Sequence, residues 1–324
     1  MKVLYLNVPG MLQPWYDDFR SAVGEGHTVC LYDPEKPMDG QFEDVDVVVD
    51  QGGSVGTRAL IDAALAARVK LWQVLGTGVD HVDVAYFLEK GLMLANTPGP
   101  FSAVALAEHA MFLMLYFAKQ FDEHVRNLRS KVFYFPVSEE LSGKTLALVG
   151  LGASGQALAT RAKAMGMRIA AVDAVDIPRQ RLDELGVEVF AAPGELEGVL
   201  AQADYVSLHV PLTSKTRHII DSRALAAMKP TAVLINVARG EIADEDALVE
   251  ALRSGGIRGA GLDVYAEEPL PADHPFMKLP NVVATPHTAG QTYGTSRRRG
   301  EACAENVDRI ARGLEPLYRI TEAG

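Results

Sequence analysis

A Gly-x-Gly-x-x-Gly loop formed by Gly150, Gly152 and Gly155 constrains the fold more than any other feature of this chain. The apolar run 146–149 before it predicts a buried strand, and 156–165 after it predicts a helix. The first glycine permits a tight turn, the second lets the backbone approach a pyrophosphate, and the third lets the helix pack closely on the strand. The pattern therefore indicates a doubly wound α/β sheet that binds a dinucleotide.

The phosphates of such a ligand would lie on the backbone N–H groups of residues 153–155, at a helix N-terminus whose dipole favours negative charge. Asp173 ends the next predicted strand, where a carboxylate accepts both ribose hydroxyls, although an aspartate that only caps a loop is the alternative. A 2′-phosphate would face like charge there, and Ala174 and Val175 follow in place of an arginine. We therefore expect NAD rather than NADP, and Arg179 is the residue that would favour NADP.

Two domains are expected for 324 residues, at roughly 100–200 residues per domain. Short apolar runs alternate with helical patterns before residue 100, and a second such series begins at Thr145. This alternation predicts parallel sheets covered on both faces. A long apolar helix starts near Ser102, and it is expected to cross between the domains and also to pack against a second subunit. A final helix, about 292–312, is expected to return the chain to the first domain. The second series has six strand candidates, at 145–149, 168–172, 205–210, 232–237, 259–262 and 282–285.

The formal net charge of −11 argues against nucleic acid or an anionic membrane as partner, since both require clustered basic residues. The one dense basic cluster, 297–299, is interpreted as a solvated or ion-paired helix face, with a local phosphate contact as the alternative. The most apolar stretch, 103–118, falls short of the about 20 residues of a membrane span. Cys30 and Cys303 form neither a disulfide framework nor a zinc site, so no metal is expected. We expect a cytoplasmic protein without a signal peptide.

Polar residues follow several predicted strands, at the sheet edge where open α/β sheets bind ligands. Arg239 can clamp a carboxylate through two parallel N–H donors, although a surface ion pair is the usual role of an arginine. His287 can pass a proton to and from a carbonyl oxygen near neutral pH. Glu268 would bind the far ring nitrogen of His287 and fix its tautomer. This combination predicts hydride transfer to a 2-oxo acid, with a purely structural His287 as the alternative.

The chain resembles the D-isomer-specific 2-hydroxyacid dehydrogenase family, which includes glyoxylate and hydroxypyruvate reductases and phosphoglycerate dehydrogenases. The resemblance runs from Gly76-Thr77-Gly78-Val79-Asp80-His81-Val82-Asp83 to about Gln291. It includes Ala107-Glu108-His109, Leu208-His209-Val210-Pro211-Leu212-Thr213 and Leu262-Asp263-Val264-Tyr265-Ala266-Glu267-Glu268-Pro269. Such a series in this order is highly specific.

The resemblance implies two Rossmann-like domains with parallel sheets, the cofactor domain (101–291) being inserted into a flavodoxin-like substrate domain (1–100 plus 292–324). It also implies a homodimer, and it assigns the catalytic roles to Arg239, Glu268 and His287. The substrate carboxylate would meet backbone N–H groups of Thr77, Gly78 and Val79, beside Arg239 and His287. The expected cofactor contacts are Gly150, Gly152, Ala153, Ser154, Gly155, Gln156, Asp173, His209, Val210, Pro211, Thr216, Val237, Ala238, Asp263 and Ala289.

Two departures from the family pattern affect this assignment. The segment 102–107 is a residue longer than usual before Ala107-Glu108-His109, and Gln156 stands where a hydrophobic residue or arginine is common, so it could contact a phosphate. An NAD-sensing interaction protein, like the corepressors on the same scaffold, is an alternative from another class, because a fold does not fix a function. A formate-oxidising enzyme is a further alternative, but Glu268 speaks against it. The sequence does not identify the 2-hydroxy acid.

Overall fold

The computed structural model describes residues 1–38, 40–52 and 56–322. The chain divides into two compact units, of which the first comprises Met1–Ser102 with Gln291–Gly324 and the second Ala103–Gly290. The chain thus passes from one unit to the other after residues 102 and 290, where the sequence predicted 100 and 291. Residues 323 and 324 of the predicted first domain lie outside the described part. No helix among the described residues is long and apolar enough to cross a membrane.

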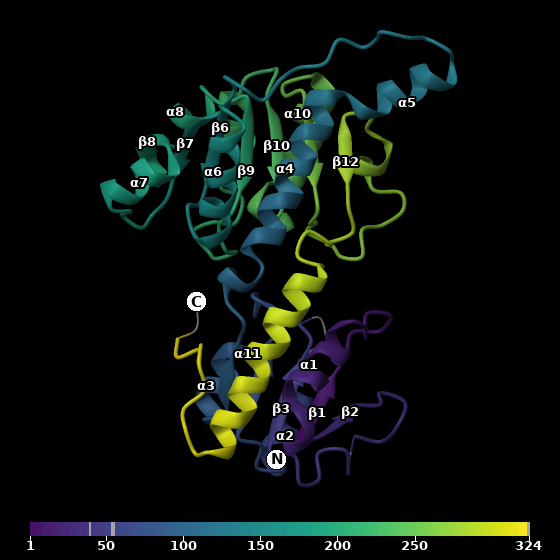
Figure 1. The fold of residues 1–324 in the computed structure, drawn as a ribbon, viewed down its shortest axis with the longest axis vertical. Coiled ribbons are helices and arrows are strands. Elements are labelled where there is room, and N and C mark those ends of the chain that lie inside the picture. The colour runs from purple at the N-terminus through teal and green to yellow at the C-terminus, as the bar shows by residue number, and fades with distance from the viewer. Residues whose placement is uncertain (39, 53–55, 323–324) are drawn as a thin grey trace. The chain divides into compact units, whose positions relative to one another are not determined.

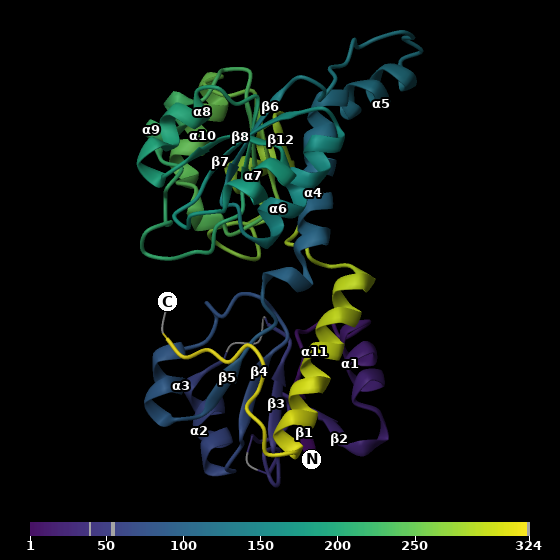
Figure 2. The ribbon, with the colours of Figure 1, turned by 60° about the vertical axis from the view of Figure 1, so that its left-hand side comes forward.

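The sheet of the first unit, which lies in the lower part of Figure 1 and is labelled in full in Figure 2, has five parallel strands in the order β2-β1-β3-β4-β5. This is the 2-1-3-4-5 order of flavodoxin-like sheets, as predicted. The strands are β1 (Lys2–Leu6), β2 (Thr28–Leu31), β3 (Val47–Asp50), β4 (Leu71–Val74) and β5 (Met93–Ala95).

Both faces of this sheet are covered by helices, as Figure 2 shows. On one face Phe19 and Val307 pack against Tyr5 and Leu71. On the other, Ile61 and Phe87 pack against Trp72 and its neighbours. The helices are α1 (Trp15–Val23) and α11 (Tyr293–Ala311) on the first face, and α2 (Arg58–Ala66) and α3 (Val84–Lys90) on the second. Single helical turns lie at Gly24–Gly26 and Gly99–Phe101. Because α11 comes from the end of the chain, the first unit is closed only by residues that follow the whole second unit.

The sheet of the second unit has seven parallel strands in the order β12-β11-β10-β9-β6-β7-β8. The strand order reverses between β6 and β9, which makes the edge beyond their carboxyl ends a topological switch point. The strands are β6 (Thr145–Val149), β7 (Arg168–Val172), β8 (Val187–Ala191), β9 (Tyr205–Leu208), β10 (Val233–Asn236), β11 (Gly259–Leu262) and β12 (Val282–Ala284).

Strand β8, at the edge of this sheet, was not predicted from the sequence. Glu188 and Val189 of this strand are exposed, so the strand lacks the continuous apolar run that marks its buried neighbours. The two faces of the sheet carry separate cores, one under α4, α6 and α7 and one under α8, α9 and α10. The helices are α4 (Ala103–Lys119), α5 (Phe121–Arg129), α6 (Ala153–Ala164), α7 (Arg179–Leu185), α8 (Leu196–Leu200), α9 (Ser222–Ala227) and α10 (Glu245–Ser254), with single turns at Pro193–Glu195, Gly240–Ile242 and Pro275–Lys278.

Candidate active site

The glycine loop joins β6 to α6, and its three glycines have different structural roles. Gly150 has a φ of +98°, a conformation that L side chains rarely adopt, and a side chain there would overlap the backbone of His209. A side chain at Gly155 would overlap the carbonyl of Gly150, so the helix can approach the strand only with glycine there. At Gly152 a side chain would meet open space within the described structure. The first and third glycines therefore serve packing, and the second leaves room for a ligand.

The N-terminus of α6 directs its first amides at this open space. Gln156 N donates the first helical bond to Gly152 O, so the amides of Ala153, Ser154 and Gly155 precede the helical ladder. No side chain caps the helix at Gly152. These amides are placed as an anion-binding site requires.

The polar side chains around the loop hold it in place. His209 lies between Ser154 and Ser207, its Nδ1 being 3.0 Å from one hydroxyl and its Nε2 2.9 Å from the other. Burial lowers the pKa of His209 to about 4, so the ring is neutral. Gln156 donates to Leu151 O at 3.0 Å and accepts from Arg181 at 2.9 Å. The side chains of His209 and Gln156 thus stabilise the loop by hydrogen bonds, a role that was not predicted from the sequence.

Asp173 lies where the sequence predicted, directly after β7. One carboxylate oxygen accepts from Leu151 N at 2.6 Å and the other from Val175 N at 2.9 Å. A carboxylate has about four lone-pair sites, so two remain for ribose hydroxyls. The guanidinium of Arg179 forms a surface ion pair with Asp183 at 2.8 Å, its side chain 73% exposed.

The other expected cofactor contacts lie on segments that follow the strands. The Thr216 hydroxyl donates to Pro211 O at 2.6 Å and accepts from Thr213 N at 2.8 Å, which closes the turn after β9. Val210 is half-buried. Val237 and Ala289 are buried and pack in the core beneath α4 and α6. Because both side chains are buried, they leave little surface for a ligand. Any contact of Val237 or Ala289 with the cofactor is therefore through the backbone.

His287 and Glu268 form a hydrogen-bonded pair in the second unit. The distance between His287 Nδ1 and Glu268 Oε2 is 2.7 Å, and the other carboxylate oxygen accepts from Tyr265 N at 2.9 Å. Burial raises the pKa of Glu268, but the hydrogen bond and charge of His287, the bond from Tyr265 N and the charge of Arg239 together outweigh it and hold that pKa below its usual value. The carboxylate is therefore ionised and accepts a hydrogen bond from Nδ1, so Nε2 is the ring nitrogen that could exchange a proton with a ligand.

Asp263 fixes the backbone that carries His287. Its side chain accepts from Thr285 Oγ1 at 2.6 Å, from Thr288 N at 2.8 Å and from Ala289 N at 2.8 Å. Its carbonyl accepts from His287 N at 2.8 Å. His287 has a φ of +53°, a left-handed conformation that needs such support outside glycine.

His109 on α4 completes this network. Its Nε2 is 3.0 Å from Thr285 Oγ1, and because that hydroxyl donates to Asp263, the imidazole is the donor to it. Burial lowers the pKa of His109, although Asp263 opposes the shift. The sequence marked Asp263 but gave no reason to connect it with Thr285 or with a helix far away in the chain.

Arg239 follows β10 and is held by its neighbours. The buried Asn236 side chain donates to Arg239 O at 2.8 Å and accepts from Ala238 N at 3.1 Å. A guanidinium nitrogen of Arg239 donates to Ala238 O at 2.8 Å. Gly240 packs so closely on the backbone after Tyr265 that any side chain would overlap it. Gly240 is therefore required for this close approach.

In the first unit, residues 76–79 follow β4 and form what we call the 76–79 loop. The Asn96 side chain donates to Thr77 O at 2.7 Å, and the backbone and hydroxyl of Thr97 donate to Gly76 O at 3.0 and 3.1 Å. Two carbonyls of the loop are thus fixed by residues that directly follow β5. Because a carbonyl shares its peptide plane with the next amide, these bonds orient the amides of Thr77 and Gly78. With the amide of Val79, they are the groups that the family resemblance predicts to bind a carboxylate.

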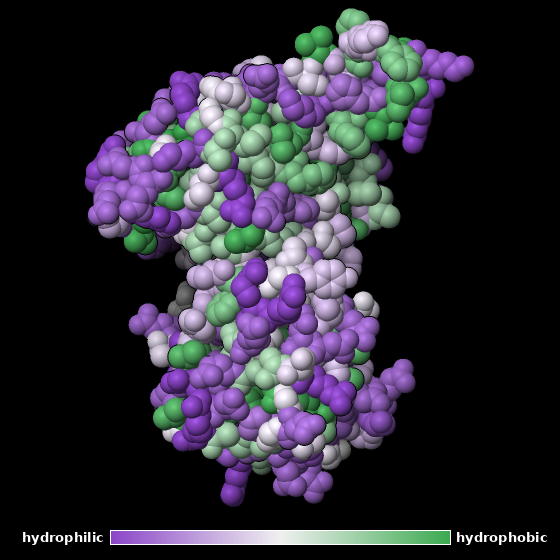
Figure 3. Space-filling model, in the orientation of Figure 1, coloured by the Kyte–Doolittle hydropathy of each residue, from purple (hydrophilic) through white to green (hydrophobic). Residues whose placement is uncertain are grey.

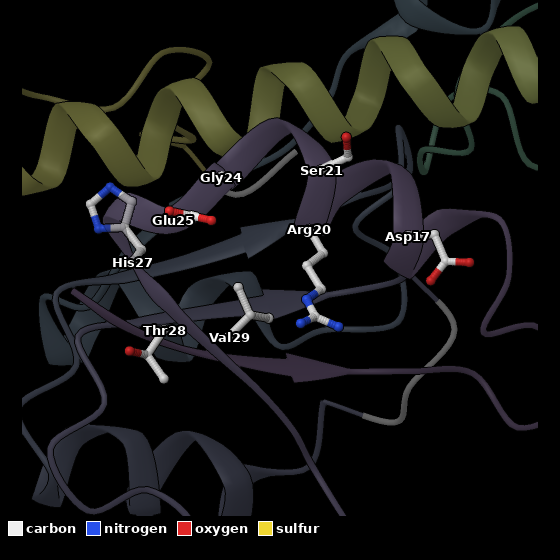
Figure 4. Close-up of a pocket in the computed structure, with 8 residues that line it drawn as sticks. All are labelled: Asp17, Arg20, Ser21, Gly24, Glu25, His27, Thr28 and Val29. Atoms are coloured by element: carbon white, nitrogen blue, oxygen red, sulfur yellow. The ribbon is translucent and has the colours of Figure 1, made fainter.

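The first unit also has an open groove beside α1 and β2 (Figure 4). None of the residues predicted for the site lines it. Its lining residues are Asp17, Arg20, Ser21, Gly24, Glu25, His27, Thr28 and Val29. Among the described residues, no group of three or more His, Cys, Asp or Glu is arranged to hold a metal ion.

Comparison with known proteins gives a consistent answer. Residues 111–289, more than half of the chain, match the model of the D-isomer specific 2-hydroxyacid dehydrogenase NAD-binding domain. The chain is 40% identical over 275 residues to D-3-phosphoglycerate dehydrogenase of Methanocaldococcus jannaschii, covering 84% of this chain and 51% of that protein. It is also 40% identical over 264 residues to glyoxylate reductase of Korarchaeum cryptofilum, covering 79% and 77% of the two proteins. The chain thus spans about half the length of the first relative.

Among solved structures, D-lactate dehydrogenase from Aquifex aeolicus, complexed with NAD and lactic acid, has a TM-score of 0.83 and 27% identity. The alignment covers 99% of this chain and all of that one. The fold, the strand-end residues and these matches agree. The chain therefore belongs to the D-isomer specific 2-hydroxyacid dehydrogenase family, and its second unit contains the NAD-binding domain of that family.

Proposed function

We propose that this NAD-dependent D-2-hydroxyacid dehydrogenase reversibly transfers a hydride between NAD(H) and a small 2-oxo acid or D-2-hydroxy acid. His287 acts as general acid and base, Glu268 orients it, and Arg239 binds the substrate carboxylate. The observation that carries the proposal is the 2.7 Å bond between His287 Nδ1 and Glu268 Oε2 beside the charge of Arg239. A structural histidine would have no need of an ionised partner and a strained backbone at the ligand edge of the sheet.

Each of these residues has its own role in the proposed reaction. Bound NADH supplies the hydride. As the carbonyl carbon is reduced, His287 Nε2 gives its proton to the carbonyl oxygen, and in the reverse direction it takes that proton back. Glu268 stabilises the ring while its charge changes, and the guanidinium of Arg239 binds the carboxylate and so fixes which carbonyl face is presented. From the first unit, we propose the amides of Thr77, Gly78 and Val79 as further donors to the substrate.

The residues around the glycine loop fit NAD. Space at Gly152 and the first amides of α6 suit a pyrophosphate, and Asp173 has lone pairs available for ribose hydroxyls. We propose NAD over NADP because the Asp173 carboxylate would repel a 2′-phosphate and Arg179 is engaged by Asp183. We propose Asp263 and Ala238 O as the nicotinamide contacts. The residues after β9, including His209, Val210, Pro211 and Thr216, form the proposed adenosine side.

A substrate panel tests the proposal. Purified protein is mixed with NADH or NADPH and with glyoxylate, hydroxypyruvate, pyruvate and longer 2-oxo acids, and cofactor oxidation is followed by absorbance. We expect turnover of at least one small 2-oxo acid, faster with NADH. No oxidation with any member of the panel would refute the activity. The relatives named as reductases and dehydrogenases do not favour the alternative of an NAD-sensing interaction protein.

We further propose a homodimer formed through the second unit. The segment from α4 through α5 to residue 137 exposes many large apolar side chains, and Figure 3 shows hydrophobic surface over α5 and the loop after it. An exposed apolar patch of this kind marks an interaction site. The members are Val104, Phe112, Phe121, Leu128, Val132, Phe133, Tyr134, Phe135 and Val137, with Tyr134 97% exposed.

Light scattering after size exclusion tests the dimer. The wild-type protein should elute at twice the mass of one chain, and a Phe133→Asp, Phe135→Asp double variant should shift toward the single-chain mass. A wild-type protein that is monomeric at all concentrations would contradict the proposal. The cytoplasmic location stays a prediction.

A further inference from the structure

The basic triplet 297–299 on α11, interpreted from sequence as a solvated or ion-paired helix face, is solvated only in part. Only Arg297 is exposed, and its Nε lies 3.4 Å from Tyr293 O on its own helix. Arg298 donates to Phe101 O at 3.0 Å, and Arg299 donates to Thr77 Oγ1 at 3.0 Å. The third arginine therefore reaches the 76–79 loop.

The guanidinium of Arg299 is held in place by its surroundings. Its centre lies 5.8 Å from the ring centroid of Trp15, a side chain that is only 4% exposed. The Nε atom of Arg299 is itself buried. An arginine over an indole face gains from the ring quadrupole and from packing, and its planar shape loses little freedom there. The positive charge is therefore fixed in position beside the loop.

The contact with Thr77 acts on the loop at its centre. The Thr77 hydroxyl donates to Thr97 O at 3.1 Å, so it accepts the bond from Arg299. Its carbonyl is held by Asn96 and that of Gly76 by Thr97. Thr77 is thus held at both its carbonyl and its hydroxyl. Its amide belongs to the same peptide group as the Gly76 carbonyl, so the bonds from Thr97 set the direction of that amide.

We propose that Arg299 is a positioning residue for the carboxylate-binding 76–79 loop and that its charge strengthens binding of the substrate anion. This inference rests on the proposed function of the loop. Arg299 acts through Thr77, by fixing the orientation of the loop amides, and through space, because a fixed guanidinium attracts an anion bound beside it. Binding of the carboxylate is equally strong in the ground state and the transition state, so the effect belongs in KM rather than kcat.

The test compares Arg299→Met, Arg299→Lys and the matched control Arg297→Met, which removes a neighbouring exposed charge from the same helix. Steady-state reduction of the best 2-oxo acid gives KM and kcat, and calorimetry with oxalate in the presence of NAD gives anion affinity without turnover. For Arg299→Met we expect KM and the oxalate Kd to rise on the order of ten- to hundredfold, the range for losing a hydrogen bond to a charged group, with little change in kcat. Arg299→Lys should recover part of the affinity, and Arg297→Met should match the wild type.

A double-mutant cycle with Thr77→Val tests the route. If Arg299 acts through the hydroxyl, Arg299→Met should cost less in the Thr77→Val background than in the wild type. Strictly additive effects would overturn the route through Thr77, and a lowered melting temperature with unchanged KM and oxalate Kd would overturn the whole proposal. A wild type that binds oxalate but reduces no 2-oxo acid would refute the proposed function, while the oxalate comparison would still decide the role of Arg299.

Discussion

The two units share one architecture but prepare their ligand edges differently. In the first unit, side chains just after β5 and on α11 hold the 76–79 loop, whose backbone amides we propose as the contact with the ligand. In the second, buried Asp263 and Asn236 hold backbone segments from which His287 and Arg239 project. A parallel sheet can therefore offer either amides or ionisable side chains at its carboxyl edge. Proton transfer requires the second kind, whereas recognition of a carboxylate can use either.

The largest effect is expected at the side chain that only the second unit provides. His287→Gln keeps a polar group of similar size but cannot carry the proton, so kcat should fall by about 10²–10⁴-fold. NADH affinity, measured by fluorescence titration, should stay unchanged. His124→Gln, on α5, is the control and should retain wild-type kcat. Equal activity of the His287 variant would remove the proton-transfer role from the second unit.

The next effect concerns the substrate clamp. Arg239→Lys keeps the charge but loses the planar fork, and the loss of one charge-assisted hydrogen bond should raise KM on the order of ten- to hundredfold. The measurement is KM for the 2-oxo acid at saturating NADH. If KM is unchanged here but rises in Arg299→Met, the first unit alone recognises the carboxylate.

A pair of glycine substitutions separates ligand binding from packing within the second unit. Gly152→Ala adds a side chain in open space, so the melting temperature should be unchanged while the NADH Kd rises, on the order of tenfold if a pyrophosphate oxygen is displaced. Gly155→Ala would overlap the Gly150 carbonyl and should cost stability, about 1–3 kcal/mol by overpacking. Thermal melts with and without NADH measure both. An unaltered NADH Kd in Gly152→Ala would contradict the proposed phosphate site.

The smallest effect is a pH dependence of stability. The folded pKa of Glu268 lies below its usual value, so its ionised form stabilises the fold. This contribution is fully present above the unfolded value of about 4.3 and is lost as the pH falls through the lower folded value. The difference in melting temperature between wild type and Glu268→Gln should therefore be constant near neutral pH and shrink below about pH 4. A difference that grows on acidification would show that the carboxylate is not stabilised by its partners.

Local patterns predicted most elements because they depend on neighbours in the sequence. Apolar runs gave the buried strands, and the side chains of Asp221 and Asp244 cap α9 and α10, a local pattern typical of helix starts. The edge strand β8 was missed because its exposed residues interrupt the apolar run on which strand prediction depends.

The sequence by itself determined the family resemblance, the glycine loop and the strand-end positions of Asp173, Arg239 and His287. These features depend on short stretches of sequence. A short pattern places a residue at the edge of a sheet regardless of which other residues pack against it. Only the tertiary structure decided which distant partners hold them. Thr77 meets Arg299 across 222 residues, and His109 meets Thr285 across 176. No periodicity carries such pairings, because they arise only when separate helices and strands pack together.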